Sequence, residues 1–124
     1  VMESLWAERS AWLSPGWLYH LALRQEWNAA RREGVYRRST RGRALEEVGF
    51  IHLSAAHQVQ ATAQRFYGDL PAGEVLLLRI DPQRLSGAGL DVREEPAPGT
   101  GELFPHLYGA LPLEAVLLAQ PLQP

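Results

Sequence analysis

Two residue types that many enzymes depend on are missing from this chain. It contains no cysteine, which excludes a disulfide framework, a cysteine-ligated zinc or iron–sulfur site and a thiol nucleophile. Its twelve basic residues are all arginine, so a Schiff-base lysine, a phosphate-loop lysine and a kinase-type lysine are excluded as well. Imidazole, carboxylate, hydroxyl and guanidinium groups remain as the available chemistry.

Long hydrophobic runs are also absent. The longest aliphatic runs, Val75–Leu78 and Ala115–Ala119, are far shorter than the ~20 residues that a membrane helix needs. Residues 1–14 include three charged side chains, which does not fit a signal peptide. We therefore expect a soluble, cytoplasmic protein with no membrane partner.

The 124 residues correspond in length to one domain, and four tryptophans with a hydrophobic fraction of 46% can fill one core. Pro15-Gly16 separates an N-terminal arm, residues 1–16, from a single domain over 17–124.

The hydrophobic pattern predicts about five strands and two or three helices. Strands are expected over 17–23, 50–53, 74–81 and 115–120, with shorter ones over 35–38 and 90–93. Helices are expected over 25–33 and 55–67, with shorter ones over 3–13 and 41–48. Asp81-Pro82 predicts a turn, and residues 94–112, rich in proline and glycine, predict an irregular segment. The order lacks βαβ alternation, which favours an α+β fold.

Two histidines fall on strands. Alternation places His20 on the same face as Leu18 and Ala22, and it places His52 on the same face as Phe50 and Ser54. If these strands are neighbours, two imidazoles and a hydroxyl line one cleft, where imidazole can exchange protons near neutral pH. The alternative is that each histidine is a hydrogen-bonded core residue and that Ser54 caps the helix 55–67.

The segment 94–112 supplies a third group of candidates, because long structureless segments in a compact domain are often functional. Glu102 and His106 can form an acid/base pair or contact a ligand together with Tyr108. The alternative is a rim loop with a solvated Glu102 and a packed Tyr108. No paired histidine spacing supports zinc held by His20, His52 and His106, so no metal is expected.

Charge is distributed unevenly along the chain. Residues 24–43 carry seven arginines against two glutamates, a net of +5, whereas residues 69–124 carry three arginines against eight acids, a net of −5. The arginines can bind phosphates, or they can form a solvated surface. Arg65 lies beside Phe66 at the edge of the apolar stripe formed by Ala55, Val59, Ala63 and Phe66, so it can point into the same cleft.

Several motifs make the chain similar to a known bacterial family, domain of unknown function 952, from about residue 17 to 122. The matching motifs are Leu18-Tyr19-His20, Gly49 to Ser54, Arg65-Phe66-Tyr67, Leu77 to Pro82, Gly101 to Gly109 and Leu111-Pro112-Leu113.

That family resembles the ADP-ribosyltransferase fold, a small mixed or antiparallel split sheet that holds NAD in a cleft. The resemblance implies that His20 binds a ribose, that His52 and Ser54 line the nicotinamide end, and that Glu102 polarises the nicotinamide ribose. Arg65 and Tyr108 are further candidate contacts to the cofactor.

The implied activity is an NAD-dependent ADP-ribose transferase or glycohydrolase. The alternatives are a non-catalytic nucleotide-binding module and an enzyme that processes an RNA 2′-phosphate. Toxins that share the ADP-ribosyltransferase fold have a tyrosine pair that stacks on nicotinamide. This pair is not evident in the present sequence.

Overall fold

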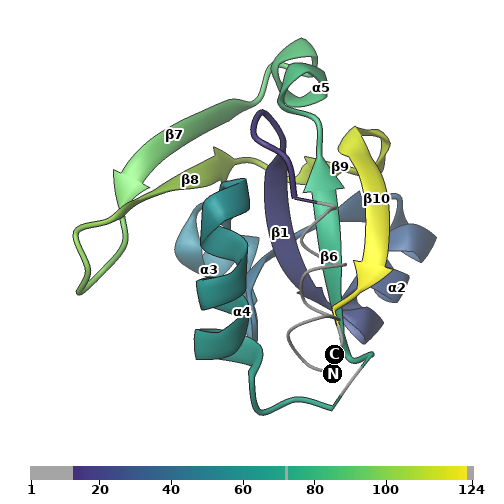
Figure 1. Ribbon diagram of the computed structural model, residues 1–124. Helices are drawn as coiled ribbons and strands as arrows, with labels where there is room; N and C mark the ends of the chain where they lie inside the picture. The colour runs from purple at the N-terminus through teal and green to yellow at the C-terminus, as the bar shows by residue number, and fades with distance from the viewer. Residues whose placement is uncertain (1–12, 72, 123–124) are drawn as a thin grey trace.

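Two antiparallel sheets of three strands form the framework of the computed structural model, which describes residues 13–71 and 73–122 (Figure 1). The first sheet has the order β1-β6-β10, with bounds Leu18–Leu23, Val75–Ile80 and Val116–Pro121. The second has the order β5-β8-β7, with bounds Ile51–His52, Leu103–Tyr108 and Asp91–Pro96. In Figure 1 the β7–β8 hairpin projects away from the first sheet.

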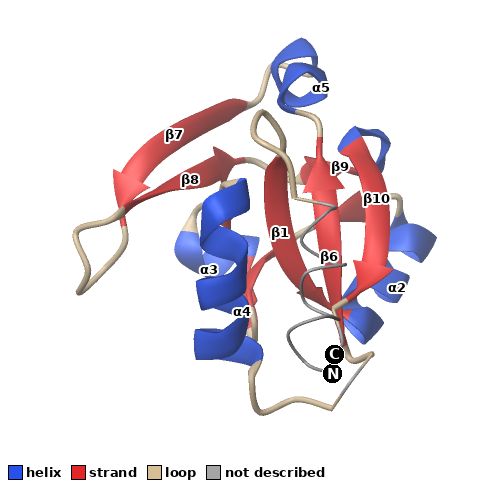
Figure 2. Ribbon diagram, viewed as in Figure 1, coloured by secondary structure: helices blue, strands red, loops and turns tan. Residues whose placement is uncertain are grey.

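Shorter strands and four α-helices complete the described part of the chain (Figure 2). The strand pairs are β2 (Val35–Tyr36) with β9 (Leu111–Pro112), and β3 (Arg38–Thr40) with β4 (Arg43–Ala44). The α-helices are α2 (Arg24–Glu33), α3 (Leu45–Val48), α4 (Val59–Tyr67) and α5 (Pro82–Gly87); the 3₁₀ turns are η1 (Ala56–Gln58) and η2 (Leu113–Ala115). The predicted α+β class is confirmed. None of the helices in residues 13–71 and 73–122 has the length and apolarity needed to cross a membrane.

Within the described residues, the two sheets meet at a β-bridge between β1 and Ser54, two residues after the end of β5. The Tyr19 amide donates to the Ser54 carbonyl at 2.9 Å, and the Ser54 amide donates to the Tyr19 carbonyl at 2.7 Å. Away from this bridge the two sheets diverge, so together they form one split sheet.

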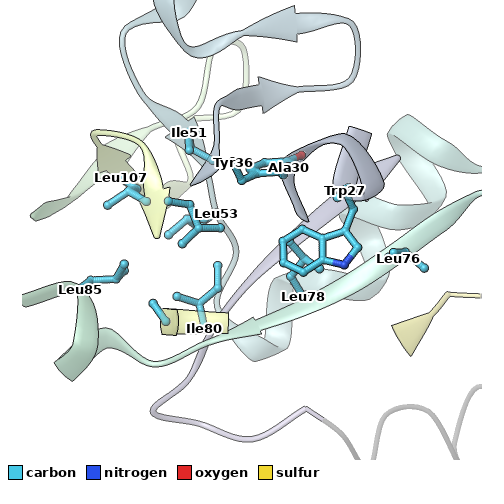
Figure 3. Close-up of a cluster of buried hydrophobic side chains, with 13 residues drawn as sticks. Trp27, Ala30, Tyr36, Ile51, Leu53, Leu76, Leu78, Ile80, Leu85 and Leu107 are labelled. Carbon is cyan, nitrogen blue, oxygen red and sulfur yellow. The ribbon is translucent and has the colours of Figure 1, made fainter. Parts of the chain in front are cut away.

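Each face of the first sheet buries its own apolar cluster, as the alternation along β6 requires. Leu76, Leu78 and Ile80 belong to the larger cluster, which also contains Trp27 of α2 and Leu107 of β8 (Figure 3). The opposite face carries the smaller cluster, which joins strand residues to α4 and consists of Tyr19, Leu21, Val59, Tyr67, Val75 and Leu77. The predicted faces of β1 are confirmed, because Ala22 lies in the larger cluster and Leu21 in the smaller.

Most long elements agree with the sequence pattern. The structure confirms the strands expected over 17–23, 74–81 and 115–120, and the helix over 25–33 ends at Gly34, whose φ is 92°. The helix expected over 3–13 and most of the N-terminal arm, residues 1–16, fall outside the described residues.

The prediction of an irregular segment over 94–112 is wrong. Residues 91–96 and 103–108 pair in register as the antiparallel strands β7 and β8, with Glu95 opposite Phe104. Glycines 99 and 101, both at positive φ, lie in the connecting turn. Pro96 is tolerated because it ends β7, an edge strand with one free side, and Pro105 lies on β8 just beyond its two-residue ladder with β5.

Three local predictions need correction. Residues 41–48 form a turn, β4 and only a short helix, because Gly42 at φ 74° reverses the chain after β3. Asp81-Pro82 begins a helix rather than a turn, since the Asp81 carboxylate accepts the Gln83 amide and proline occupies the first helical turn. Ser54 is not the helix cap. The N-cap residue is Ala55, one residue later, and its backbone amide donates a hydrogen bond to the Gln58 side chain.

The apolar stripe of α4 also differs from the prediction at its C-terminal end. Val59 and Ala63 pack in the smaller cluster as expected, but Tyr67 takes the buried place, and Phe66 is 52% exposed. The 3₁₀ turn that precedes α4 shifts the helical phase, so the stripe that the sequence suggests from Ala55 onward does not continue unbroken.

Candidate functional site

One face of the second sheet gathers polar and aromatic side chains from three strands. His52 of β5 lies opposite His106 of β8, which in turn lies opposite Arg93 of β7. Because residues two apart share a face, Tyr108 and Glu95 lie on this face too. The other face of the sheet carries residues such as Ile51 and Leu107, which belong to the larger core cluster. We call the cluster of Phe50, His52, Arg93, Glu95, His106 and Tyr108 the ring cluster.

Aromatic and imidazole rings pack closely within the ring cluster. The Phe50 ring stacks on the His106 ring, with centroids 3.9 Å apart and planes 16° apart. The His52 ring stands at 79° to the His106 ring, with centroids 5.3 Å apart. Tyr108 lies 5.5 Å from Phe50, and the Arg93 guanidinium carbon lies 4.3 Å from the centre of the Tyr108 ring. The cluster therefore offers flat ring surfaces beside charged groups.

Glu95 is the carboxylate of the ring cluster. Its Oε1 accepts hydrogen bonds from Nδ1 of His106 at 2.8 Å and from the Tyr108 hydroxyl at 2.6 Å. These two donors lower the pKa of Glu95, the tyrosine contributing more, so the side chain is ionised at neutral pH. Its Oε2 has no hydrogen-bond partner in the part of the chain that the structure describes, and the side chain is 33% exposed. One oxygen therefore fixes the carboxylate, and the other is available to a ligand.

His106 is buried but only half satisfied. Because the ionised Glu95 can only accept, the Nδ1 atom of His106 carries the proton. Its Nε2 atom is buried without a hydrogen-bond partner among the described residues. Buried polar atoms are normally satisfied, so an orphan of this kind is a feature that a bound ligand can explain.

His52 is half-buried, and its ring nitrogens have no hydrogen-bond partner in the described segments. Burial lowers the pKa of His52, and the nearby His106 and Arg43 lower it further. The ring is therefore neutral at pH 7 and can donate or accept a hydrogen bond.

His20 of β1 is buried and contacts the backbone that carries the ring cluster. Its Nδ1 donates to the His52 carbonyl at 2.6 Å, and its Nε2 accepts from the Tyr36 hydroxyl at 2.9 Å. Burial lowers the pKa of His20 to about 4, so the ring is neutral. Ser39 makes a matching contact, since its hydroxyl donates to the Phe50 carbonyl. These two side chains fix the backbone that carries Phe50 and His52.

Glu102 lies in the turn of the β7–β8 hairpin. Its Oε2 accepts a hydrogen bond at 2.9 Å from the side-chain amide of the buried Gln58, which also donates to the Leu103 carbonyl. The structure thus places Glu102 against η1, whereas the carboxylate that contacts His106 is Glu95. Glu95 is not among the residues predicted from the sequence, because the sequence pattern does not predict a hairpin. Pairing around the glycines at 99 and 101 would have placed residue 95 beside residues 104 and 106.

The remaining predicted site residues are dispersed. Ser54 is buried and forms the backbone bridge to Tyr19, and Arg65 is exposed on the last turn of α4, 5.2 Å from the Phe66 ring. His20, His52 and His106 do not form one ligand set, because both ring nitrogens of His20 are already engaged within the protein.

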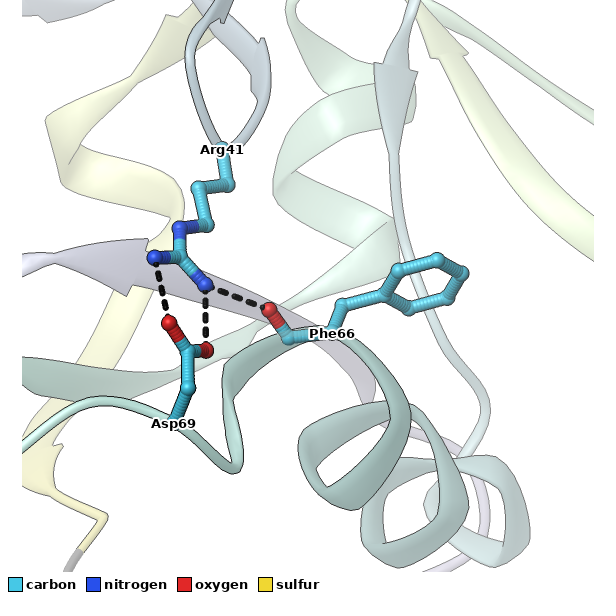
Figure 4. A network of polar contacts seen from close by, with 3 residues as sticks. All are labelled: Arg41, Phe66 and Asp69. Atoms are coloured by element: carbon cyan, nitrogen blue, oxygen red, sulfur yellow. Dashed lines mark hydrogen bonds and ion pairs between the residues drawn. The ribbon is translucent and has the colours of Figure 1, made fainter.

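All four arginines between residues 37 and 43 have acidic partners. Arg41 makes the best-formed pair, with its two terminal nitrogens 2.7 and 3.0 Å from the Asp69 carboxylate and a further bond to the Phe66 carbonyl (Figure 4). The other pairs are Arg37–Glu46, Arg38–Glu26 and Arg43–Glu47. A pocket of about 520 Å³ between α2 and β2–β4 is lined by two of these pairs, Arg37–Glu46 and Arg38–Glu26, and contains none of the predicted site residues.

Comparisons with known proteins agree with this architecture. The family model described as "Protein of unknown function (DUF952)" matches residues 21–119. A crystal structure of protein CC0527 from Caulobacter crescentus is 32% identical, with a TM-score of 0.67 over 85% of this chain and 84% of that chain. A solution NMR structure of the same protein is 33% identical, with a TM-score of 0.68 over 87% and 85%. No curated protein matches the chain. With a family match over most of its length, the chain belongs to the DUF952 family.

Proposed function

We propose that the ring cluster binds a nicotinamide dinucleotide and that Glu95 promotes cleavage of its nicotinamide–ribose bond, giving an ADP-ribose transferase or glycohydrolase. The observation that carries the proposal is the Glu95 carboxylate, which is fixed through Oε1 by His106 and Tyr108 and is open at Oε2. The split antiparallel sheet supports the resemblance to the ADP-ribosyltransferase fold.

The chemistry suits these groups. In NAD the nicotinamide ring is flat and positively charged, so it can pack on the aromatic faces of Phe50 and His52. When the C–N bond breaks, its electron pair leaves with the nicotinamide and neutralises the ring. The ribose becomes an oxocarbenium ion, which an ionised Glu95 stabilises until water or another acceptor adds to C1′ and releases a proton. No oxidant, reductant or metal is required.

The site residues differ in role from those that the sequence resemblance implies. Both ring nitrogens of His20 are engaged by protein groups, so in this proposal His20 positions His52 rather than binding a ribose. His52 lines the nicotinamide end, and Glu95 takes the part that the resemblance gave to Glu102. Ser54 and Arg65 have no direct part.

Nicotinamide release from NAD tests the proposal. We expect Glu95→Gln to lower the rate about 100-fold or more, as removal of a group that stabilises developing charge does. Glu94→Gln is the matched control, because Glu94 is the exposed neighbour on the opposite face of β7. Glu102→Gln separates the two carboxylate candidates and should leave the rate near that of the wild type. A wild-type protein that releases no nicotinamide with any acceptor would contradict the transferase and the glycohydrolase alike.

A nucleotide-binding module without turnover is the second candidate, favoured by one observation. Nε2 of His106 is buried, and Phe50 covers one face of the His106 ring, so this nitrogen is shielded from solvent before a ligand binds. This candidate predicts a rise in melting temperature with NAD or ADP-ribose and no release of nicotinamide. The arginines over residues 37–43 are already paired with carboxylates, so they do not support the alternative of an enzyme that processes an RNA 2′-phosphate.

A further inference from the structure

The orphaned Nε2 atom of His106 points to a specific hydrogen bond with the ligand. The side chain is 97% buried, as its 3% exposure shows, and Nε2 has no partner among the described residues. In the neutral imidazole, the proton that Glu95 holds on Nδ1 leaves a lone pair on Nε2. A buried acceptor of this kind selects for a group that donates a hydrogen bond.

Movement of one neighbouring side chain can open a path to this atom. The Nε2 lone pair lies in the plane of the imidazole, so stacking of Phe50 on the face of the ring does not satisfy it. The ring that stands nearly perpendicular to His106 is His52. No hydrogen bond within the described residues holds the His52 ring, so a change of its rotamer breaks ring contacts with Phe50 and His106 but no hydrogen bond. His20 meanwhile keeps the His52 backbone in place.

We propose that His106 Nε2 accepts a hydrogen bond from the carboxamide N–H of nicotinamide and thereby makes the site selective for the amide form of the dinucleotide. This inference rests on the proposed function, since it assumes that a nicotinamide dinucleotide occupies the ring cluster. The corresponding dinucleotide of nicotinic acid has a carboxylate at this position. That carboxylate has no hydrogen to donate and meets the negative charge of the adjacent Glu95, so it binds less well.

The test compares NAD, nicotinic acid adenine dinucleotide and ADP-ribose by isothermal titration at pH 8 and low temperature. Histidines of ordinary pKa are neutral at this pH, and assay of the recovered ligand shows whether the dinucleotides stayed intact. We expect wild-type protein to prefer NAD over the acid form by about tenfold or more, the ratio that one hydrogen bond of about 1.4 kcal/mol supplies.

His106→Asn is the decisive variant, because its amide nitrogen can replace Nδ1 toward Glu95 while nothing replaces Nε2. We expect the preference for NAD to fall to about equal binding, with the affinity for ADP-ribose unchanged. His57→Asn, at an exposed histidine on η1, is the control and should keep the preference.

A second measurement applies if His106→Asn does not fold. In wild-type protein with labelled histidine, the Nε2 resonance of His106 should shift when NAD binds, but not when ADP-ribose or the acid form binds. Equal binding of the two dinucleotides by wild type, or a preference retained in His106→Asn, overturns this inference and leaves the proposed function standing. Failure of both dinucleotides to bind overturns both.

Discussion

The four histidines of this chain occupy four different environments, and their surroundings decide what each can do. His20 has both ring nitrogens bonded inside the protein, whereas His106 has one bonded and one orphaned. His52 is half-buried, its ring has no hydrogen bond within the described residues, and His57 is exposed on η1. The same imidazole is therefore a structural group at one position and a candidate ligand contact at two others.

Protonation of His20 should make the protein sensitive to acid. The folded-state pKa of about 4 lies below the ordinary value of 6.5, so between these pH values only the unfolded chain binds the proton. The free energy of unfolding should therefore fall as pH is lowered from about 6.5 to about 4, by about 3 kcal/mol from this residue. Urea unfolding at intervals between pH 7 and pH 4 measures the loss.

The variant His20→Asn removes the titrating group and retains an amide N–H for the His52 carbonyl. Its unfolding free energy at pH 7 should be lower than that of wild type, but it should fall less steeply toward pH 4. Because the pKa of His52 is lowered as well, some slope remains in the variant. An unchanged slope would show that His20 does not titrate in this window.

At the level of single residues, the sequence predicted the candidate site only in part. Strand alternation placed Phe50 and His52 on one face, as the structure does, and the segment from Glu102 to Tyr108 contains two further members of the ring cluster, His106 and Tyr108. The sequence could not show that the Tyr36 hydroxyl forms a hydrogen bond with His20, because that contact depends on how β2 packs against β1. Glu95 was missed for the same kind of reason, since its role depends on the pairing of β7 with β8.

The β7–β8 hairpin carries four of the six residues of the ring cluster, Arg93 and Glu95 on β7 and His106 and Tyr108 on β8, and only the pairing of the two strands brings them together. Long elements with strong hydrophobic patterns, such as β6 and α2, were predictable because the pattern alone specifies their buried faces. The hairpin was not, because β7 is mostly exposed and β8 contains a proline. Its structure comes from cross-strand contacts such as Glu95 with Tyr108 rather than from local propensity.

Gly109 limits how β8 can end. Its φ of 147° is rarely adopted by other residues, and a Cβ built there would lie 2.5 Å from a methyl carbon of Leu90. We expect Gly109→Ala to destabilise the protein by about 1–3 kcal/mol and to weaken ligand binding, because Tyr108 precedes it. Thermal unfolding and NAD titration measure the two effects.

Gly87→Ala is the matched control for Gly109→Ala. Gly87 is at the end of α5, its φ is not positive, and a Cβ there meets open space. Its substitution should change stability by less than about 1 kcal/mol, in either direction. Equal losses in the two variants would mean that the backbone at Gly109 adapts to a side chain.

In the molecule as a whole, one apolar cluster joins the two halves of the split sheet. Leu78 of the first sheet and Leu107 of the second are both fully buried in it. Within residues 13–71 and 73–122, few backbone hydrogen bonds cross the split apart from the bridge between Tyr19 and Ser54. The shared core and the buried contacts of His20 therefore hold the ring cluster in a fixed position relative to the first sheet.

Truncation of either core leucine should accordingly destabilise both sheets together. We expect Leu107→Ala and Leu78→Ala each to cost about 2–5 kcal/mol and each protein to unfold in a single transition. Amide hydrogen exchange distinguishes the sheets, since Leu107→Ala should reduce protection in β1 and β6 as much as in β7 and β8. If protection in β1 and β6 stayed at the wild-type level, the second sheet would be opening on its own, and the ring cluster would be mobile relative to the rest of the fold.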